Sequence, residues 1–210
     1  MGSSQTVPSR RTRAPRGGGD KLRTEILTAA ENLLVQTCDE AAVTVRAVAN
    51  AVGVTPPSIY LHFADKDELL VAVCERNFEE LSAAVERAAG EATDPRDALR
   101  LAATAYVHFG LARPEQYRIL FMRKAGPQTE QMELDRLRSS SGFNLLLDTV
   151  QACMQAGLMR RSDPMVVAVV LWSIVHGLTS LMISKPAFEW PPMEEMVDHA
   201  TRAYLDGLRP

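Results

Sequence analysis

Side chains able to contact a polyanion are concentrated between Thr44 and Lys66. Ile59 and Phe63 are four residues apart, a spacing that places two apolar side chains on one face of a helix. Three polar side chains then face outward: Ser58, Tyr60 and His62. Their hydroxyls and imidazole can bond phosphate oxygens and fix the register of a protein on nucleic acid, but they carry little information about base sequence. The pattern therefore favours binding of nucleic acid over catalysis.

Two short helices around a tight turn are predicted to position this outward face. The first has an N-cap hydroxyl at Thr44 and an apolar stripe with helical spacing: Val45, Val48, Ala49 and Val52. Gly53 provides the permissive backbone that ends this helix. Pro56 fits the first position of the second helix, with Thr55 as its cap. Such a pair is a helix-turn-helix, whose second helix has the size to enter a major groove.

The chain continues as Tyr-x-His-Phe-x-x-Lys-x-x-Leu-Leu from Tyr60 to Leu70, and here it resembles the TetR family of bacterial transcriptional repressors. The resemblance is carried by Ala49, Gly53, Val54, Thr55, Ile59, Tyr60, His62, Phe63, Lys66, Leu69 and Leu70. It implies that one set of residues lies near phosphates: Thr44, Thr55, Tyr60, His62 and Lys66. It places a second set over base edges, Pro56, Pro57 and Ser58, and we add Arg46 to the DNA contacts. Tandem prolines depart from many relatives, which carry a small residue near position 57, so the start of this recognition helix is stiff. Tyr60 is alternatively a packing residue.

The distribution of charge, rather than its total, agrees with this prediction. The 210 residues have a formal net charge of −3, but residues 1–25 hold six basic side chains against two acidic ones. Residues 1–19 are too poor in apolar residues to order themselves, so we expect a disordered basic arm that either contacts DNA or stays solvated. The three cysteines are widely spaced and are expected to be reduced thiols in a cytoplasmic protein.

The remainder of the chain shows helical patterns separated by breakers and no convincing strand. The fold class predicted is all-α, with about nine helices: a three-helix DNA-binding domain over residues 20–66 and a larger helical domain over residues 67–210. Expected helices cover residues 20–37, 66–90, 95–110, 114–124, 129–156, 164–184 and 193–208, the fifth of them bent at residues 139–142. Residues 165–184 carry no charge and could span a membrane by length, but their polar residues favour a helix buried among other helices.

A second resemblance concerns this larger domain. Residues 114–121, together with Trp172-Ser-Ile-Val-His176-Gly177, resemble the effector domain of a TetR subgroup named for a Trp-His-Gly sequence. Trp172 and His176 share a helix face and either line a ligand pocket, with His176 as its polar handle, or belong to the core. The other candidates for ligand contact, each also a candidate core residue, are Tyr106, Phe109, Tyr117, Phe121, Phe143 and Met154.

The resulting hypothesis is a homodimeric repressor that binds a palindromic operator in double-stranded DNA and is released by a small, apolar effector. Residues 164–184 and 192–208 are the expected dimer interface. The sequence shows no metal-ligand spacing, nucleophile motif or glycine-rich phosphate loop, so we expect no enzyme, no metal and no cofactor. An undetected enzyme, an interaction module, and a regulator controlled by a protein partner without a small-molecule effector remain alternatives.

Overall fold

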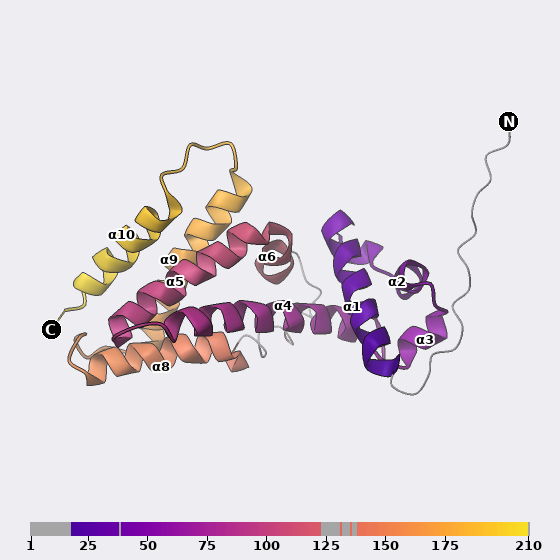
Figure 1. The fold of residues 1–210 in the computed structure, drawn as a ribbon, viewed down its shortest axis with the longest axis horizontal. Helices are drawn as coiled ribbons and strands as arrows, with labels where there is room; N and C mark the ends of the chain where they lie inside the picture. The colour runs from indigo at the N-terminus through magenta and orange to yellow at the C-terminus, as the bar shows by residue number, and fades with distance from the viewer. Residues whose placement is uncertain (1–17, 38, 123–130, 132–134, 136–137, 210) are drawn as a thin grey trace. The chain divides into compact units, whose positions relative to one another are not determined.

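A computed structural model describes residues 18–37, 39–122, 131, 135 and 138–209 (Figure 1). Within these ranges the chain forms nine α-helices and one 3-10 turn, with no strand, so the predicted all-α class is confirmed. The chain divides into two compact units, one of residues 1–76 with 121–133 and one of residues 77–120 with 134–210. We call them the N-terminal and C-terminal units. The predicted basic arm lies outside the described residues, except that Gly18 and Gly19 begin the first helix.

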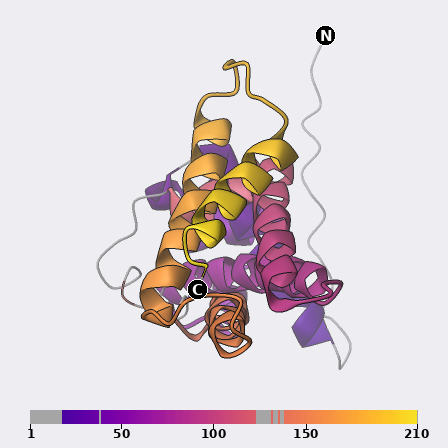
Figure 2. The same ribbon diagram turned by 90° about the vertical axis from the view of Figure 1, so that its left-hand side faces the viewer.

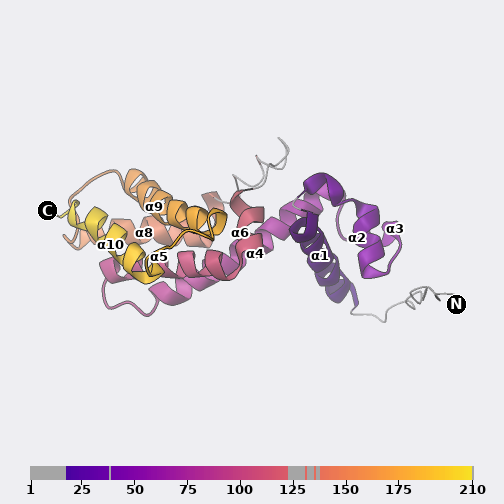
Figure 3. The same cartoon turned by 90° about the horizontal axis from the view of Figure 1, so that it is seen from above.

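The N-terminal unit contains α1 (Gly18–Thr37), the 3-10 turn η1 (Glu40–Ala42), α2 (Val45–Val52) and α3 (Pro56–Tyr60). It also contains the first part of α4 (Lys66–Ala89). In Figure 3, α1 lies beside α2, and α2 leads through a short turn into α3. The interior of this unit includes the side chains of Ile26, Val48, Ile59, Phe63 and Leu69, all fully buried. Val45 and Val52, at the two ends of α2, are half-buried.

The C-terminal unit is built around α5 (Pro95–Ala112), which packs against three other helices: α8 (Ser141–Gln155), α9 (Pro164–Ser184) and α10 (Met193–Asp206). α6 (Pro114–Phe121) follows α5 directly. Figure 2 shows α9 and α10 side by side, joined by a loop at one end. Their core cluster consists of Leu99, Val150, Cys153, Met159, Val167, Ala168, Leu171, Leu205 and Leu208.

Helix starts in the C-terminal unit follow from capping chemistry. The Asp94 carboxylate accepts hydrogen bonds from the backbone N–H groups of Arg96 (2.8 Å) and Asp97 (3.0 Å), and Asp163 caps Met165 in the same way (2.9 Å). Both aspartates precede a proline at the first helical position, which needs no hydrogen-bond partner for its nitrogen.

The predicted single helix over residues 129–156 needs a correction. Ser140 has extended backbone angles (φ −65°, ψ 140°), and its Oγ caps α8 by accepting from Phe143 N at 3.3 Å. A new helix therefore begins at Ser141 in place of a bend in a continuous helix. Most of residues 129–137 lie outside the described residues.

By length and hydropathy α9 could cross a membrane, and it is the one such helix among the described residues. This is weak evidence, because the core helix of a soluble protein passes the same test. α9 packs against α5, α8 and α10, and its Val167, Ala168 and Leu171 belong to the core cluster.

Candidate functional site

The turn between α2 and α3 has the backbone that the sequence predicts. Thr44 Oγ1 accepts from Ala47 N at 3.1 Å and caps α2. Gly53 adopts the left-handed conformation, with φ 77°, and its N–H closes α2 onto Ala49 O at 3.0 Å. Glycine adopts this conformation without the steric cost that a side chain adds. The turn therefore fixes the direction in which α3 leaves α2.

The start of α3 differs from expectation in one respect. Thr55 stands at the N-cap with extended backbone, but its side chain makes no capping hydrogen bond. Pro57 at the second helical position has no N–H to donate, and the N–H of Ser58 at the third position bonds Thr55 O instead (2.9 Å). The Thr55 hydroxyl instead lies 3.2 Å from the hydroxyl of Ser58. The N-terminus of α3 thus presents pyrrolidine rings and two hydroxyls to its surroundings.

The predicted DNA contacts fall into two groups by exposure. Six side chains are exposed: Thr44, Arg46, Thr55, Pro56, Pro57 and Tyr60. Three are half-buried: Ser58, His62 and Lys66. Ile59 is fully buried between them, which gives α3 the inward and outward faces that the spacing predicts.

Lys66 has an intramolecular role that its sequence position does not reveal. Its Nζ donates to Glu40 O at 3.0 Å, so its ammonium bridges the first turn of α4 to η1. The Glu68 carboxylate accepts from Ala64 N at 2.5 Å, and Asp65 caps the same turn through Glu68 N at 2.8 Å. The segment that follows α3 is therefore tied into the fold of the N-terminal unit.

One exposed side chain beside α3 was not among the predicted contacts. Leu61 follows Tyr60 directly and is 82% exposed, whereas Tyr60 is 54% exposed. An apolar side chain so accessible next to a polar face has no packing function within the described residues. Leu61 lies between Tyr60 and His62, which the sequence predicts to face outward, and this position could have indicated that Leu61 is exposed as well.

In the C-terminal unit, four of the predicted ligand residues form one hydrogen-bonded cluster. The hydroxyl of Tyr117 lies 2.7 Å from His176 Nδ1, and the hydroxyl of Tyr106 lies 3.2 Å from the same nitrogen. Trp172 Nε1 donates to the Tyr106 hydroxyl at 3.2 Å. Ser180, four residues after His176 on α9, brings its Oγ within 3.4 Å of His176 Nε2, and sequence reasoning did not include it.

Burial determines the protonation of this cluster, which we call the Tyr–His network. Desolvation lowers the pKa of His176, so the imidazole is neutral at pH 7. Burial raises the pKa of Tyr117 and, more strongly, that of Tyr106, so both phenols keep their protons. A neutral imidazole with Nδ1 as acceptor carries its hydrogen on Nε2, which can donate to Ser180. The network is therefore uncharged and its polar atoms are satisfied internally.

The remaining predicted ligand residues do not all join this network. The ring of Phe143 meets Trp172 edge-on, with centroids 6.3 Å apart, and so extends it. Phe109 lies under the guanidinium of Arg113 at 5.0 Å, and Met154 packs against the core cluster at α8. Phe121 is assigned to the N-terminal unit. The neighbours of Met154 are those of a core residue, one of the two interpretations that the sequence left open.

Comparison with known families identifies both units. Residues 99–204 match a family model described as "Tetracyclin repressor-like, C-terminal domain", and residues 26–73 match "Bacterial regulatory proteins, tetR family". The chain belongs to the tetR family. This family consists of transcription regulators. Membership of a subgroup defined by the Trp-His-Gly sequence stays a prediction.

Relatives of this tetR-family chain include "HTH-type transcriptional activator FasR" of Mycolicibacterium smegmatis, 32% identical over 126 residues. The match covers 56% of this chain and 57% of FasR, so it spans little more than half of that relative. A solved protein of unknown function from Rhodococcus sp. RHA1 is 27% identical, with TM-score 0.72 over 90% of this chain and 96% of its own. FadR from Bacillus subtilis, solved in complex with stearoyl-CoA, shares the fold with TM-score 0.75 at 13% identity, over 89% of this chain and 99% of its own.

Proposed function

We propose that this tetR-family regulator is a homodimeric repressor that binds a palindromic operator and is released when an apolar small molecule enters the C-terminal unit. The observation that carries the DNA-binding part is the division of α3 into a buried face at Ile59 and an exposed face at Pro56, Pro57 and Tyr60. An exposed helix face on a rigid turn is what insertion into a major groove requires.

Phosphate contacts and base contacts would come from different residues. Thr44, Arg46, Tyr60 and His62 offer donors to phosphate oxygens, which set register without reading sequence. Specificity would then depend on Ser58 at the start of α3, on contact of the two prolines with thymine methyl groups, and on DNA shape. Lys66 is a phosphate contact in this proposal only if its ammonium can reach DNA in addition to Glu40 O.

Dimerisation is supported by the surface of α9. Four large apolar side chains on this helix are exposed in the single chain: Met165, Val166, Val169 and Leu181. Exposed apolar residues gathered on one element are typical of a protein–protein interface. Because a two-fold dimer presents two recognition helices about 34 Å apart, it reads a two-fold operator.

The effector site is proposed around the partly exposed members of the Tyr–His network, Trp172 and His176, with Phe143 beside them. Because the network is uncharged, an apolar molecule with a neutral polar group suits it better than an ion. Stearoyl-CoA, solved in complex with FadR of the same fold, is the first probe: its acyl chain and thioester are uncharged and suit the network, while its charged CoA phosphates must lie outside it. Membership of the Trp-His-Gly subgroup is part of this proposal.

Release requires a difference in affinity. An effector shifts the equilibrium only if it binds more tightly to a conformer whose recognition helices are wrongly placed for the operator. The opposite preference would make the effector promote operator binding. Whether the bound protein represses or activates transcription is a separate property, and activation is the function that the name of FasR states for that relative.

The experiment that tests the proposal is selection of bound fragments from random duplex DNA with the full chain. The selected site is then titrated at 50 and 200 mM NaCl, with and without stearoyl-CoA. We expect an enriched palindrome, two protomers per site, and a loss of affinity on adding the probe. Sequence-blind binding would contradict the operator proposal.

A regulator controlled by a protein partner is the alternative. It predicts the same palindrome but no effect of any member of an apolar-compound library on melting temperature or operator affinity. That result would remove the effector part of the proposal and leave the DNA-binding part intact.

A further inference from the structure

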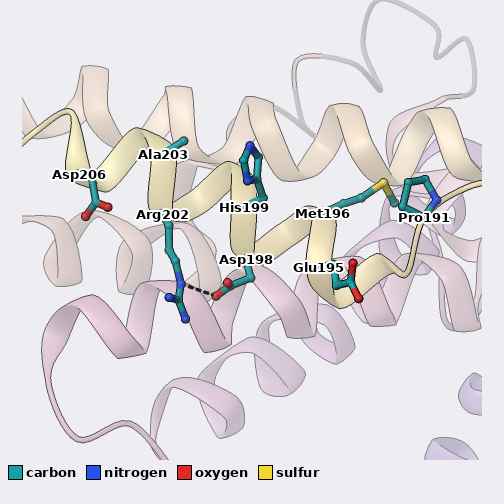
Figure 4. A pocket seen from close by; sticks show the side chains of 8 residues that line it. All are labelled: Pro191, Glu195, Met196, Asp198, His199, Arg202, Ala203 and Asp206. Atoms are coloured by element: carbon teal, nitrogen blue, oxygen red, sulfur yellow. Dashed lines mark hydrogen bonds and ion pairs between the residues drawn. The ribbon is translucent and has the colours of Figure 1, made fainter.

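The outer face of α10 carries a row of charged side chains (Figure 4). Asp206 at its end pairs with Arg96 and Arg209, whereas the members nearer its middle have no ion pair to another element among the described residues. A shallow concavity of about 640 Å³ is lined by Pro191, Glu195, Met196, Asp198, His199, Arg202, Ala203 and Asp206. Figure 4 shows Glu195, Asp198 and Arg202 extending from the same side of the helix. All but Pro191 come from this one helix, so the surface is a helix face ready to be covered by another element.

Glu195 and Arg202 are the central pair of this face. They are seven residues apart, which is two helical turns, so both lie on the same line along α10. No hydrogen bond or ion pair of Glu195 occurs within the described part of the chain, and it is exposed. Arg202 Nε bonds Asp198 Oδ1 at 2.8 Å, and the side chain of Arg202 is 67% exposed.

Asp198 therefore orients Arg202 without saturating it. A guanidinium has five N–H donors, and the bond to Asp198 uses the Nε side. The terminal nitrogens remain available for a second carboxylate, and Arg–carboxylate pairs with two parallel bonds are the strongest of this kind. The carboxylate that completes this arrangement cannot be Glu195 of the same helix, which lies two turns away.

The spacing makes the face complementary to itself. Consider two antiparallel copies of α10 related by a two-fold axis that passes between residues 198 and 199. A residue a given number of positions before the axis in one copy then faces the residue the same number of positions after the axis in the other copy. Glu195 then faces Arg202 of the second copy, and the symmetry repeats the pair. We propose that α10 is the element of self-recognition, with Glu195 and Arg202 forming two intermolecular ion pairs that select a second copy of this chain over other helices.

This inference rests on the proposed homodimer and adds which residues specify it. Acidic side chains near the start of α10 also favour the helix dipole, so the sequence alone does not require a partner. The second observation is the geometry of Arg202, which is held by Asp198 and open on its other edge. An unrelated helix with matching charges is the competing occupant, and the experiment distinguishes it.

The test uses two full-length variants with opposite charge. Glu195→Arg makes the face basic, and Arg202→Glu makes it acidic. In the homodimer of either variant, positions 195 and 202 of the two copies carry the same charge and repel each other. In a heterodimer of the two variants, each basic side chain at these positions faces an acidic one. We expect the dissociation constant of each homodimer to rise about tenfold at 50 mM NaCl. Heterodimers, counted by native mass spectrometry, should exceed half of all dimers and return toward half at 1 M NaCl.

Matched controls are Glu91→Arg and Arg161→Glu, which change charge by the same amounts at exposed positions of the C-terminal unit outside α10 and its charged face. They should leave both the homodimers and the mixing ratio unchanged. If the variant homodimers keep the wild-type dissociation constant and heterodimers make up half of all dimers in the mixture, the Glu195–Arg202 pairing is wrong, although the chain still forms a dimer. A wild-type chain that stays monomeric up to high micromolar concentration would overturn both.

Discussion

Replacing Gly110 with alanine tests how closely α5 approaches α9. A Cβ at this position would overlap Thr179 Cγ2 and would lie 2.9 Å from Tyr117 Cδ2. Neither neighbour moves freely, because Thr179 Oγ1 donates to Val175 O at 2.7 Å and the Tyr117 hydroxyl is held by His176 Nδ1. Overpacking of this kind lowers the free energy of unfolding by about 1–3 kcal/mol, and contacts this short place the loss near about 3 kcal/mol, the upper end of that range. Alanine in a helix regains about 1 kcal/mol over glycine, so the net loss is about 2 kcal/mol.

Thermal unfolding of the full chain measures this loss as a fall in Tm of about 4–8 °C, since 1 kcal/mol corresponds to about 2–4 °C for a chain of this size. Gly177→Ala is the matched control, because a Cβ there meets nothing within 4 Å, and it should raise the Tm. Thr179→Ser removes the clashing methyl and should recover part of the loss when combined with Gly110→Ala. Gly110→Ala with an unchanged Tm, or a double variant with no recovery, would refute the reasoning.

Four further predictions concern other parts of the chain. Lys66→Ala should lower the free energy of unfolding by about 1 kcal/mol through loss of the bond to Glu40 O. If Lys66 also contacts a phosphate, the variant should reduce the salt slope of operator binding by about one. An unchanged slope removes Lys66 from the DNA contacts. Trp172→Ala should alter the response to stearoyl-CoA at unchanged operator affinity, whereas loss of the folded state would assign Trp172 to the core. Asn77→Leu should raise the Tm, because both polar side-chain atoms of Asn77 are buried and have no hydrogen-bond partner within the part of the chain that the structure describes. Burial lowers the pKa of His176 in the folded chain below its ordinary value of 6.5, so the unfolded chain binds the proton more readily. The free energy of unfolding should therefore fall as the pH drops below 6.5. His176→Gln should reduce this dependence in urea titrations at pH 7.5 and 5.5.

Local chemistry explains why most of the helix limits could be predicted. The caps at Thr44, Asp94 and Asp163 and the left-handed Gly53 each depend on contacts within four residues, and the predicted features, the Thr44 cap and the Gly53 turn, have the expected geometry. The spacing of Ile59 and Phe63 likewise predicted that both side chains are buried, and they are, although α3 ends at Tyr60 and Phe63 follows the helix.

Contacts between distant residues could not be predicted in the same way. The bond from Lys66 to Glu40 O joins residues 26 positions apart, and the bond from Tyr117 to His176 joins residues 59 apart. Apolar periodicity likewise shows that Met154 is inward-facing, but not whether it meets a core or a pocket. The helix break at Ser140 was not predicted, because apolar periodicity does not show whether a serine lies inside a helix or caps a new one. In the structure Ser140 Oγ accepts from Phe143 N and so caps the start of α8.

The Tyr–His network places a physical condition on any effector that uses His176. Nδ1 of this residue already accepts a 2.7 Å hydrogen bond from Tyr117, and the neutral ring has no second acceptor nitrogen if Nε2 carries the hydrogen. A ligand that donates to Nδ1 must therefore displace Tyr117, and a ligand that accepts from Nε2 competes with Ser180 at 3.4 Å. The second route breaks the longer bond. Because Tyr117 lies on α6 and His176 on α9, only the first route breaks a bond between two helices, and only that route would convert binding directly into a change in how those helices are held together.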